Sequence, residues 1–212
     1  PMAELQTDEE KVEAIKRWWK DNGTSVIAGV VIGLGAVFGW RAWVDHRDNV
    51  GQRASLAYEQ VLAATSAGAA ESAEQMAQTL AADYGNTPYA MLADLALARV
   101  RVEQDDLAGA AAALRTALER APDPALGKLA AFRLARVLIA DGDLDGAAAV
   151  IEQHDDGGAF AGDFAGLRGD IAAAREDWDA ARAAYRQAID QQAALARVIE
   201  LKLQDLPAGD AS

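Results

Sequence analysis

The sequence contains no cysteine, and only two of its 212 residues are histidines, His46 and His154. Without thiols the chain cannot form a disulfide, a thiolate metal site or a Cys–His nucleophile, and two histidines are too few for a poly-histidine metal site. Folding needs no oxidant, so a domain outside the cytoplasm would not depend on disulfide chemistry. No nucleophile–base pair is visible, and we expect no enzyme activity, no cofactor and no bound metal.

Positive charge is also scarce. The chain has 20 basic and 33 acidic residues, a net charge of −13. Beyond residue 44 the count is 27 acidic against 15 basic residues, a net of −12. Such a domain repels phosphate backbones and anionic lipid headgroups. Nucleic-acid binding is therefore excluded.

One long apolar run is present. Twenty residues separate Lys20 from Arg41, and residues 26–40 carry no charge. A helix over 24–44 would be about 31 Å long, close to the roughly 30 Å hydrocarbon core of a bilayer. Four of the five tryptophans lie where two interfacial belts would be: Trp18, Trp19, Trp40 and Trp43. The run predicts one transmembrane helix.

A cleaved signal peptide is the alternative, because an apolar stretch of this length also suits a signal sequence. The run ends in Trp40-Arg41-Ala42-Trp43 and lacks a small-x-small cleavage site, which favours an uncleaved anchor. More basic residues precede the run than follow it, which places the N-terminus in the cytoplasm and the rest outside it. The residues compared are Lys11, Lys16, Arg17 and Lys20 before the run, with Arg47 and Arg53 after it.

The remaining sequence is alanine-rich and helical in pattern, without strand alternation. Residues 3–20 predict a short charged helix that ends at Asn22-Gly23. We therefore expect an all-α protein with a single transmembrane helix followed by a solenoid of helix pairs. The expected parts are a cytoplasmic segment (1–23), the transmembrane helix (24–44), a polar connector (45–52), the repeat domain (53–206) and a tail (207–212).

An internal repeat defines that solenoid. Leu97-Ala98-Arg99-Val100 recurs 37 residues later as Leu134-Ala135-Arg136-Val137, and a weaker copy follows another 34 residues on. This period, with small residues at fixed places, is the tetratricopeptide pattern, in which small side chains let neighbouring helices approach closely. A generic alanine-rich bundle is the alternative. The residues expected at the crossings are Ala98, Ala135 and Gly169, then Ala110, Ala147 and Ala181.

One stretch matches a calcium-loop expression. Residues 141–146, with Glu152, satisfy D-x-D-x-D-G-x5-E. The other repeats lack these ligands at the same place, and the repeat makes residues 146–149 the start of a packed helix. We therefore interpret the acids as helix caps.

Two sets of residues are candidates for protein contacts. The apolar run holds two small-xxx-small pairs on faces about 240° apart, which would allow close helix packing: Gly29 with Gly33, and Gly35 with Gly39. In the repeat domain, recurring arginines beside apolar residues would suit apolar segments that carry an acidic group. The alternatives are that glycine is simply frequent in membrane helices, and that the groove residues are core or pair with neighbouring acids. The predicted partner-binding groove comprises Leu92, Leu95, Arg99, Leu129, Phe132 and Arg136.

Several stretches together resemble a known family. They are Glu13-Ala14-Ile15-Lys16-Arg17-Trp18-Trp19 with Asn22-Gly23, then Gly39-Trp40-Arg41-Ala42-Trp43, Ser55-Leu56-Ala57-Tyr58, Leu134-Ala135-Arg136-Val137 and Leu167-Arg168-Gly169-Asp170. The chain is similar over nearly its whole length to the ancillary SecYEG translocon subunit family (YfgM-like). The likeness is most specific across residues 13–43 and departs in the second helix pair, which is richer in alanine and glycine here.

The resemblance implies a single-pass inner-membrane protein that associates with the SecYEG translocon and has a periplasmic tetratricopeptide domain. It also implies cooperation with a PpiD-like membrane-anchored periplasmic chaperone and contact with emerging secreted or membrane client proteins, without enzyme activity. A regulatory scaffold for one envelope signalling partner and an assembly factor for one envelope complex remain as alternatives.

Overall fold

The computed structural model describes residues 8–207, which form nine α-helices and no β-strand, as the all-α prediction requires. Residues 1–7 of the predicted cytoplasmic segment and 208–212 of the predicted tail lie outside the described part. Contacts divide the chain into two units, residues 1–51 and 52–212. The helices are α1 (Asp8–Ser66), α2 (Ala70–Tyr84), α3 (Pro88–Glu103), α4 (Leu107–Glu119), α5 (Pro124–Asp141), α6 (Leu144–His154), α7 (Ala161–Ala174), α8 (Trp178–Asp190) and α9 (Ala196–Asp205).

The predicted helix end at Asn22-Gly23 is wrong. α1 runs through this pair without interruption, and Gly23 does not take the left-handed conformation that would end a helix. The Asn22 side chain instead donates a hydrogen bond to the Trp18 carbonyl one turn earlier, at 3.0 Å. An apolar run follows at once, and a membrane-spanning run must satisfy its backbone hydrogen bonds within a helix. The predicted connector at 45–52 is likewise helical.

Within the described residues, α1 is the one helix long and apolar enough to cross a membrane. Only 6% of its most apolar window is buried, whereas a core helix of a globular domain would be largely covered. Apolar side chains around the predicted span are therefore open to an apolar solvent or a partner, for example Val31, Ile32 and Phe38.

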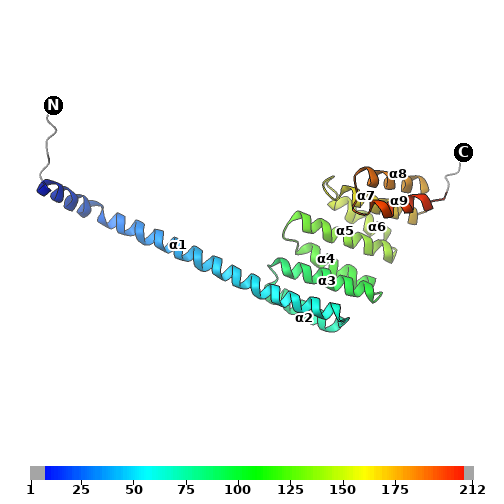
Figure 1. Ribbon diagram of the computed structural model, residues 1–212, viewed down its shortest axis with the longest axis horizontal. Coiled ribbons are helices and arrows are strands. Elements are labelled where there is room, and N and C mark those ends of the chain that lie inside the picture. The colour runs from blue at the N-terminus through cyan, green and yellow to red at the C-terminus, as the bar shows by residue number, and fades with distance from the viewer. Residues whose placement is uncertain (1–7, 208–212) are drawn as a thin grey trace, which may run out of the picture. The chain divides into compact units, whose positions relative to one another are not determined.

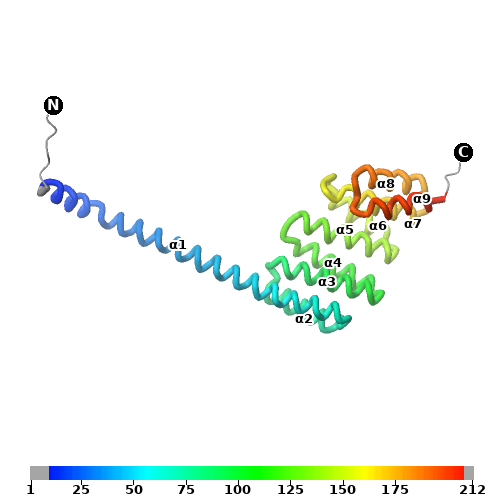
Figure 2. Tube along the Cα trace, viewed as in Figure 1, coloured from blue at the N-terminus to red at the C-terminus, as the bar shows by residue number. Residues whose placement is uncertain are grey.

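The second unit is a stack of antiparallel helix pairs (Figures 1 and 2). The end of α1 pairs with α2, then α3 with α4, α5 with α6 and α7 with α8, and α9 follows. All six small residues predicted at helix crossings are buried, including Ala110, Ala135 and Ala147 at zero exposure. Gly169 is needed at its crossing, because a Cβ there would overlap the Tyr185 ring.

The same turn joins the two helices in three of the pairs. Asp106, Asp143 and Asp177 each precede the second helix, and each carboxylate accepts a hydrogen bond from a backbone N–H three residues later. The residue just before each of these aspartates has a positive φ of 62°, 83° or 59°: Asp105, Gly142 and Glu176. Three N-caps at repeat spacing, of which Asp106 is half-buried and Asp143 and Asp177 are exposed, fix the angle at which each pair folds back.

Candidate functional site

A groove lies between α3 and α5. Its volume is about 450 Å³, and its floor is made of core side chains such as Leu95, Leu114 and Val137, which are at most 9% exposed. Val102 is 43% exposed and extends the apolar surface to the rim. We call this the arginine groove. It is lined by Leu95, Ala98, Arg99, Val102, Glu103, Leu107, Leu114, Arg133, Arg136, Val137 and Ala140.

A second, smaller groove adjoins it. We call it the α9 groove; its volume is about 230 Å³, and it lies between α5, α7 and α9. Exposed apolar residues of α9 form one wall, opposite Phe132 of α5. Arg136 lines both grooves. The lining is Phe132, Arg136, Asp163, Gly166, Leu167, Asp170, Leu195, Val198, Ile199 and Lys202.

The structure divides the predicted groove residues between these places. Leu95, Arg99 and Arg136 line the arginine groove, and Phe132 joins Arg136 in the α9 groove. Leu92 and Leu129 are partly buried against the main core cluster and line neither of the two grooves.

Sequence reasoning missed Arg133, Val102 and the α9 residues. Arg133 lies three positions before Arg136 on α5, so its helical spacing was the available signal. The α9 residues belong to no repeat copy, and nothing in the repeat pattern pointed to them.

The arginines of the groove are only lightly paired. Arg99 Nε lies 2.8 Å from Glu103 Oε1 in the same helix, with both side chains more than half exposed. Such an exposed pair contributes little to stability. Arg136 lies over the Phe132 ring, 5.8 Å from its centroid, and neither Arg133 nor Arg136 forms an ion pair with any residue of 8–207.

Arg133 also acts on the first helix pair. Burial raises the pKa of the Tyr58 hydroxyl in α1, while the positive charge of Arg133 acts in the opposite direction. Tyr58 packs against Tyr89 of α3, with ring centroids 6.0 Å apart. The electrostatic effect of Arg133 therefore extends from α5 back to α1.

The charges in the α9 groove are mostly paired. Lys202 Nζ lies 2.7 Å from Asp170 Oδ1, which also accepts a hydrogen bond from the Tyr185 hydroxyl at 2.8 Å. Asp163 accepts from the Ala194 backbone N–H at 2.8 Å. Burial, followed by the bond to Asp170, raises the pKa of Tyr185 and keeps its hydroxyl a donor. The Lys202 bond joins α9 to α7, the Ala194 bond joins the residues just before α9 to α7, and the Tyr185 bond joins α8 to α7. Arg136, the other cation of the groove, has no ion-pair partner among residues 8–207.

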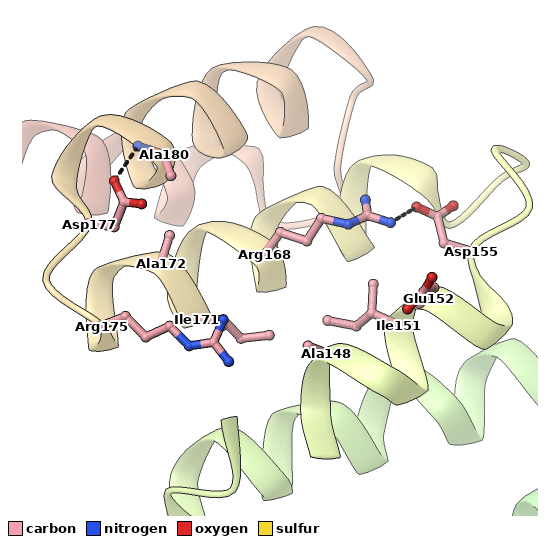
Figure 3. A pocket seen from close by; sticks show the side chains of 10 residues that line it. All are labelled: Ala148, Ile151, Glu152, Asp155, Arg168, Ile171, Ala172, Arg175, Asp177 and Ala180. Carbon is pink, nitrogen blue, oxygen red and sulfur yellow. Dashed lines mark hydrogen bonds and ion pairs between the residues drawn. The ribbon is translucent and has the colours of Figure 1, made fainter. Parts of the chain in front are cut away.

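A third hollow lies between α6, α7 and α8 and has a volume of about 570 Å³ (Figure 3). Figure 3 shows Arg168 reaching from α7 to Asp155, and the two groups are 2.6 Å apart. Arg175 pairs with Asp145, and Asp177 is the N-cap of α8. Both arginines of this hollow therefore join α7 to α6 and the loop that follows it, which indicates a structural role.

The calcium-loop match does not form a metal site in the described residues. α6 begins at Leu144, so the second half of the expression is helix. The Asp143 carboxylate caps α6 by accepting from the Gly146 N–H at 2.9 Å, and Asp145 pairs with Arg175. Within 8–207 no group of three or more His, Asp or Glu side chains is arranged to hold an ion.

The four glycines of the predicted span lie on the exposed surface of α1. A Cβ at Gly29, Gly33, Gly35 or Gly39 would meet no atom within 4 Å. The first unit therefore offers small-residue faces without contacts of its own.

Comparison with known proteins agrees with this architecture. Residues 16–208 match the tetratricopeptide repeat-like domain family. The chain is 34% identical over 203 residues to the ancillary SecYEG translocon subunit of Escherichia coli (strain K12), covering 95% of this chain and 97% of that protein. It is also similar to proteins of the same name from Aggregatibacter actinomycetemcomitans and Haemophilus influenzae, at 34% and 31% identity over 97% of this chain. These names describe a translocon subunit and no enzyme. No solved structure matches the chain.

Proposed function

Because the chain belongs to the family of ancillary SecYEG translocon subunits, with a tetratricopeptide repeat-like domain, we propose that it serves the translocon as a membrane-anchored adaptor. What carries the proposal is similarity over nearly the full length, which includes both the apolar helix and the repeat domain. The adaptor links SecYEG to a PpiD-like periplasmic chaperone and to client proteins that emerge from the channel.

The proposed topology is a single pass through the inner membrane. The N-terminus is cytoplasmic and the repeat domain is periplasmic. The excess of basic residues before the span supports this orientation. The acidic domain, with a net charge of −12 beyond residue 44, is repelled by anionic headgroups and stays clear of the bilayer surface.

The two units have separable tasks in this proposal. The glycine faces of α1 allow close packing against membrane helices of the translocon, since a Cβ at Gly29, Gly33, Gly35 or Gly39 would meet no described atom within 4 Å beyond the local helix backbone. The arginine groove binds the periplasmic partner or client, because its apolar floor suits an apolar segment, and Arg133 and Arg136, which have no ion-pair partner among residues 8–207, suit a carboxylate.

The test is co-purification from native membranes after crosslinking. Replacing the four glycines with leucine keeps α1 apolar but blocks close backbone approach, so insertion should survive while SecYEG recovery falls. Arg99→Glu with Arg136→Glu should retain SecYEG and lose periplasmic partners. Arg186→Glu, an exposed arginine on α8 outside both grooves, is the matched control.

Two results would count against the proposal. Undiminished SecYEG recovery with the leucine variant would show that the repeat domain, rather than α1, docks on the translocon. Absence of SecYEG from wild-type samples, with one defined envelope protein in its place, would favour the regulatory scaffold.

A further inference from the structure

The arginine groove and the α9 groove meet at one side chain. Arg136 lines both of them, with Val102 on the α3 side and Val198 on the α9 side. Apolar surface is exposed on each side of this arginine: Val102 at 43%, Val198 at 45% and Leu195 at 48%. The two grooves are therefore adjacent and share Arg136.

α9 has apolar side chains that the other described residues do not cover. The outer surface of a helical-repeat stack is normally polar. Here Ile199 is buried, while Leu195, Val198 and Leu201 remain 45–56% exposed. The apolar stripe of α9 is thus wider than α7 and α8 cover. Leu195 and Val198 lie on its uncovered edge, in the groove beside Phe132.

The positive charge of the arginine groove indicates that its ligand carries an acidic group. The repeat domain is strongly acidic, yet three arginines gather in the arginine groove, and Arg133 and Arg136 have no ion-pair partner among residues 8–207. The other cation of the α9 groove, Lys202, is already bound to Asp170. A carboxylate on the ligand would find a free guanidinium at the junction, in a geometry that favours paired N–H···O bonds.

The volume of the α9 groove indicates that the ligand binds as an extended chain. One turn of an α-helix, with a diameter of about 10–12 Å and a pitch of about 5.4 Å, fills roughly 400–600 Å³. The α9 groove, at about 230 Å³, accepts a side chain and not a helix. Packed helices lie about 8–10 Å apart, and the two grooves flank the same helix, α5, so their centres are separated by about one helix spacing, roughly 8–10 Å. An extended chain covers that distance in about three residues.

We propose that the two grooves form one track for an extended polypeptide segment in which an acidic residue, held by Arg136, is flanked on both sides by apolar residues. One flanking side chain enters the arginine groove beside Val102, and the other enters the α9 groove between Phe132 and Val198. This inference rests on the proposed adaptor function and names the kind of segment that the same surface takes.

The experiment uses the full chain in detergent micelles and fluorescein-labelled seven-residue peptides, with binding read as anisotropy. The parent peptide carries Asp at its centre, with Leu one residue before it and Phe two residues after it, so that the two apolar side chains are about 10 Å apart in an extended chain. Replacing that Asp with Asn should weaken binding to the wild-type chain about tenfold. Arg136→Gln should weaken the Asp peptide about as much and should no longer distinguish Asp from Asn. Arg186→Gln is the control and should behave as wild type.

The second half of the track has its own variant. Val198→Ser should weaken the full peptide severalfold but leave unchanged a truncated peptide that lacks the residues after Asp. Because Arg136 and Val198 are exposed, both variants should keep the wild-type circular dichroism spectrum.

Three results would overturn the inference. The wild-type chain could bind no peptide while still recovering SecYEG, which removes the track and leaves the adaptor function intact. Arg136→Gln could retain the preference for Asp. Concentration-dependent dimerisation, abolished by Val198→Ser, would make a second copy of the chain the occupant. Loss of SecYEG recovery together with peptide binding would instead count against the adaptor function itself.

Discussion

At the scale of single residues, three aspartates and their preceding left-handed residues set the geometry of the repeat. Asp106, Asp143 and Asp177 occupy the same N-cap position, so one local motif is used three times. The sequence predicted the cap role for the acids around 143, because carboxylates at a helix start satisfy free N–H groups and interact favourably with the helix dipole. The backbone conformations of Asp105 and Glu176 were not predictable, since positive φ is uncommon outside glycine: aspartate adopts it occasionally, and glutamate rarely does.

Two buried helical glycines provide a matched test of close packing. Gly169→Ala should lower stability by about 1–3 kcal/mol, because the added methyl would overlap the Tyr185 ring. For a domain of this size that is a fall in melting temperature of roughly 2–4 °C per kcal/mol. Gly127→Ala is the control: its Cβ would meet Ala121 at an ordinary 3.6 Å, and the helix would gain up to about 1 kcal/mol. Circular dichroism melts measure both, and equal melting temperatures would contradict the crossing assigned to Gly169.

His154 predicts a pH dependence. Burial lowers the pKa of this imidazole, and its Nε2 is buried without a hydrogen-bond partner among the described residues. The folded state therefore binds a proton less readily than the unfolded state. The stability that neutral His154 provides is present above the unfolded pKa of about 6.5 and is lost as the pH falls toward the lower folded value.

Urea unfolding at pH 7.5, 6.5 and 5.5 measures that loss. The slope should not exceed about 1.4 kcal/mol per pH unit, the limit for one proton. His154→Gln should flatten the slope, and His46→Gln, an exposed position on α1, should leave it as in wild type. The same slope in both variants would assign the pH dependence to the carboxylates.

At the scale of helices, the repeat was predictable and the long first helix was not. Small residues at a fixed period indicate places where neighbouring helices cross closely. Ala98, Ala135 and Ala147 therefore predicted the stacking of helix pairs. At α1, local stop signals and the apolar run disagreed. Asn22-Gly23 ends a helix only when a residue there becomes left-handed, and in an apolar membrane-spanning run the backbone satisfies its hydrogen bonds by remaining helical.

The residues that line the grooves could be predicted from the repeat only in part. Counting along α3 and α5 placed Leu95, Arg99 and Arg136 on one surface, and the structure brings these three together. The same count could not tell which neighbours pack inward, and Leu92 and Leu129 lie against the core. It also could not locate α9, whose position beside α5 depends on how α7 and α8 close the stack.

The hydrogen bonds and ion pair at the start of α6 predict that calcium does not change the stability of the chain. Its acids are used as a cap and in an ion pair with Arg175, so 1 mM calcium should leave the melting temperature of the chain unchanged. A site with a dissociation constant of about 10 µM would add about 2.7 kcal/mol at that concentration and raise the melting temperature by several degrees. A rise of this size, absent in Asp141→Ala, would restore the calcium-loop interpretation.

At the scale of the whole molecule, the two units differ in chemistry. The first exposes apolar side chains and glycines along α1, and the second carries almost all of the net negative charge. Each unit thus suits a different solvent, lipid for one and water for the other. The proposed function gives the two units separate tasks. The side of the membrane on which the repeat domain lies therefore decides which partners it can reach.

The absence of cysteine makes that measurement direct, because any introduced thiol is the only one in the chain. Gln187→Cys places a thiol on the exposed surface of α8, and Val12→Cys places one on an exposed position before the apolar run. In intact spheroplasts a membrane-impermeant maleimide should label the Gln187→Cys variant and leave the Val12→Cys variant unlabelled. The Val12→Cys variant should react only after the membrane is permeabilised. This outcome is expected because the four basic residues that precede the predicted span favour a cytoplasmic N-terminus. Replacing Lys11, Lys16, Arg17 and Lys20 with glutamine should weaken the asymmetry and produce a mixed population. Labelling at 12 with protection at 187 would place the repeat domain in the cytoplasm and remove its access to periplasmic chaperones.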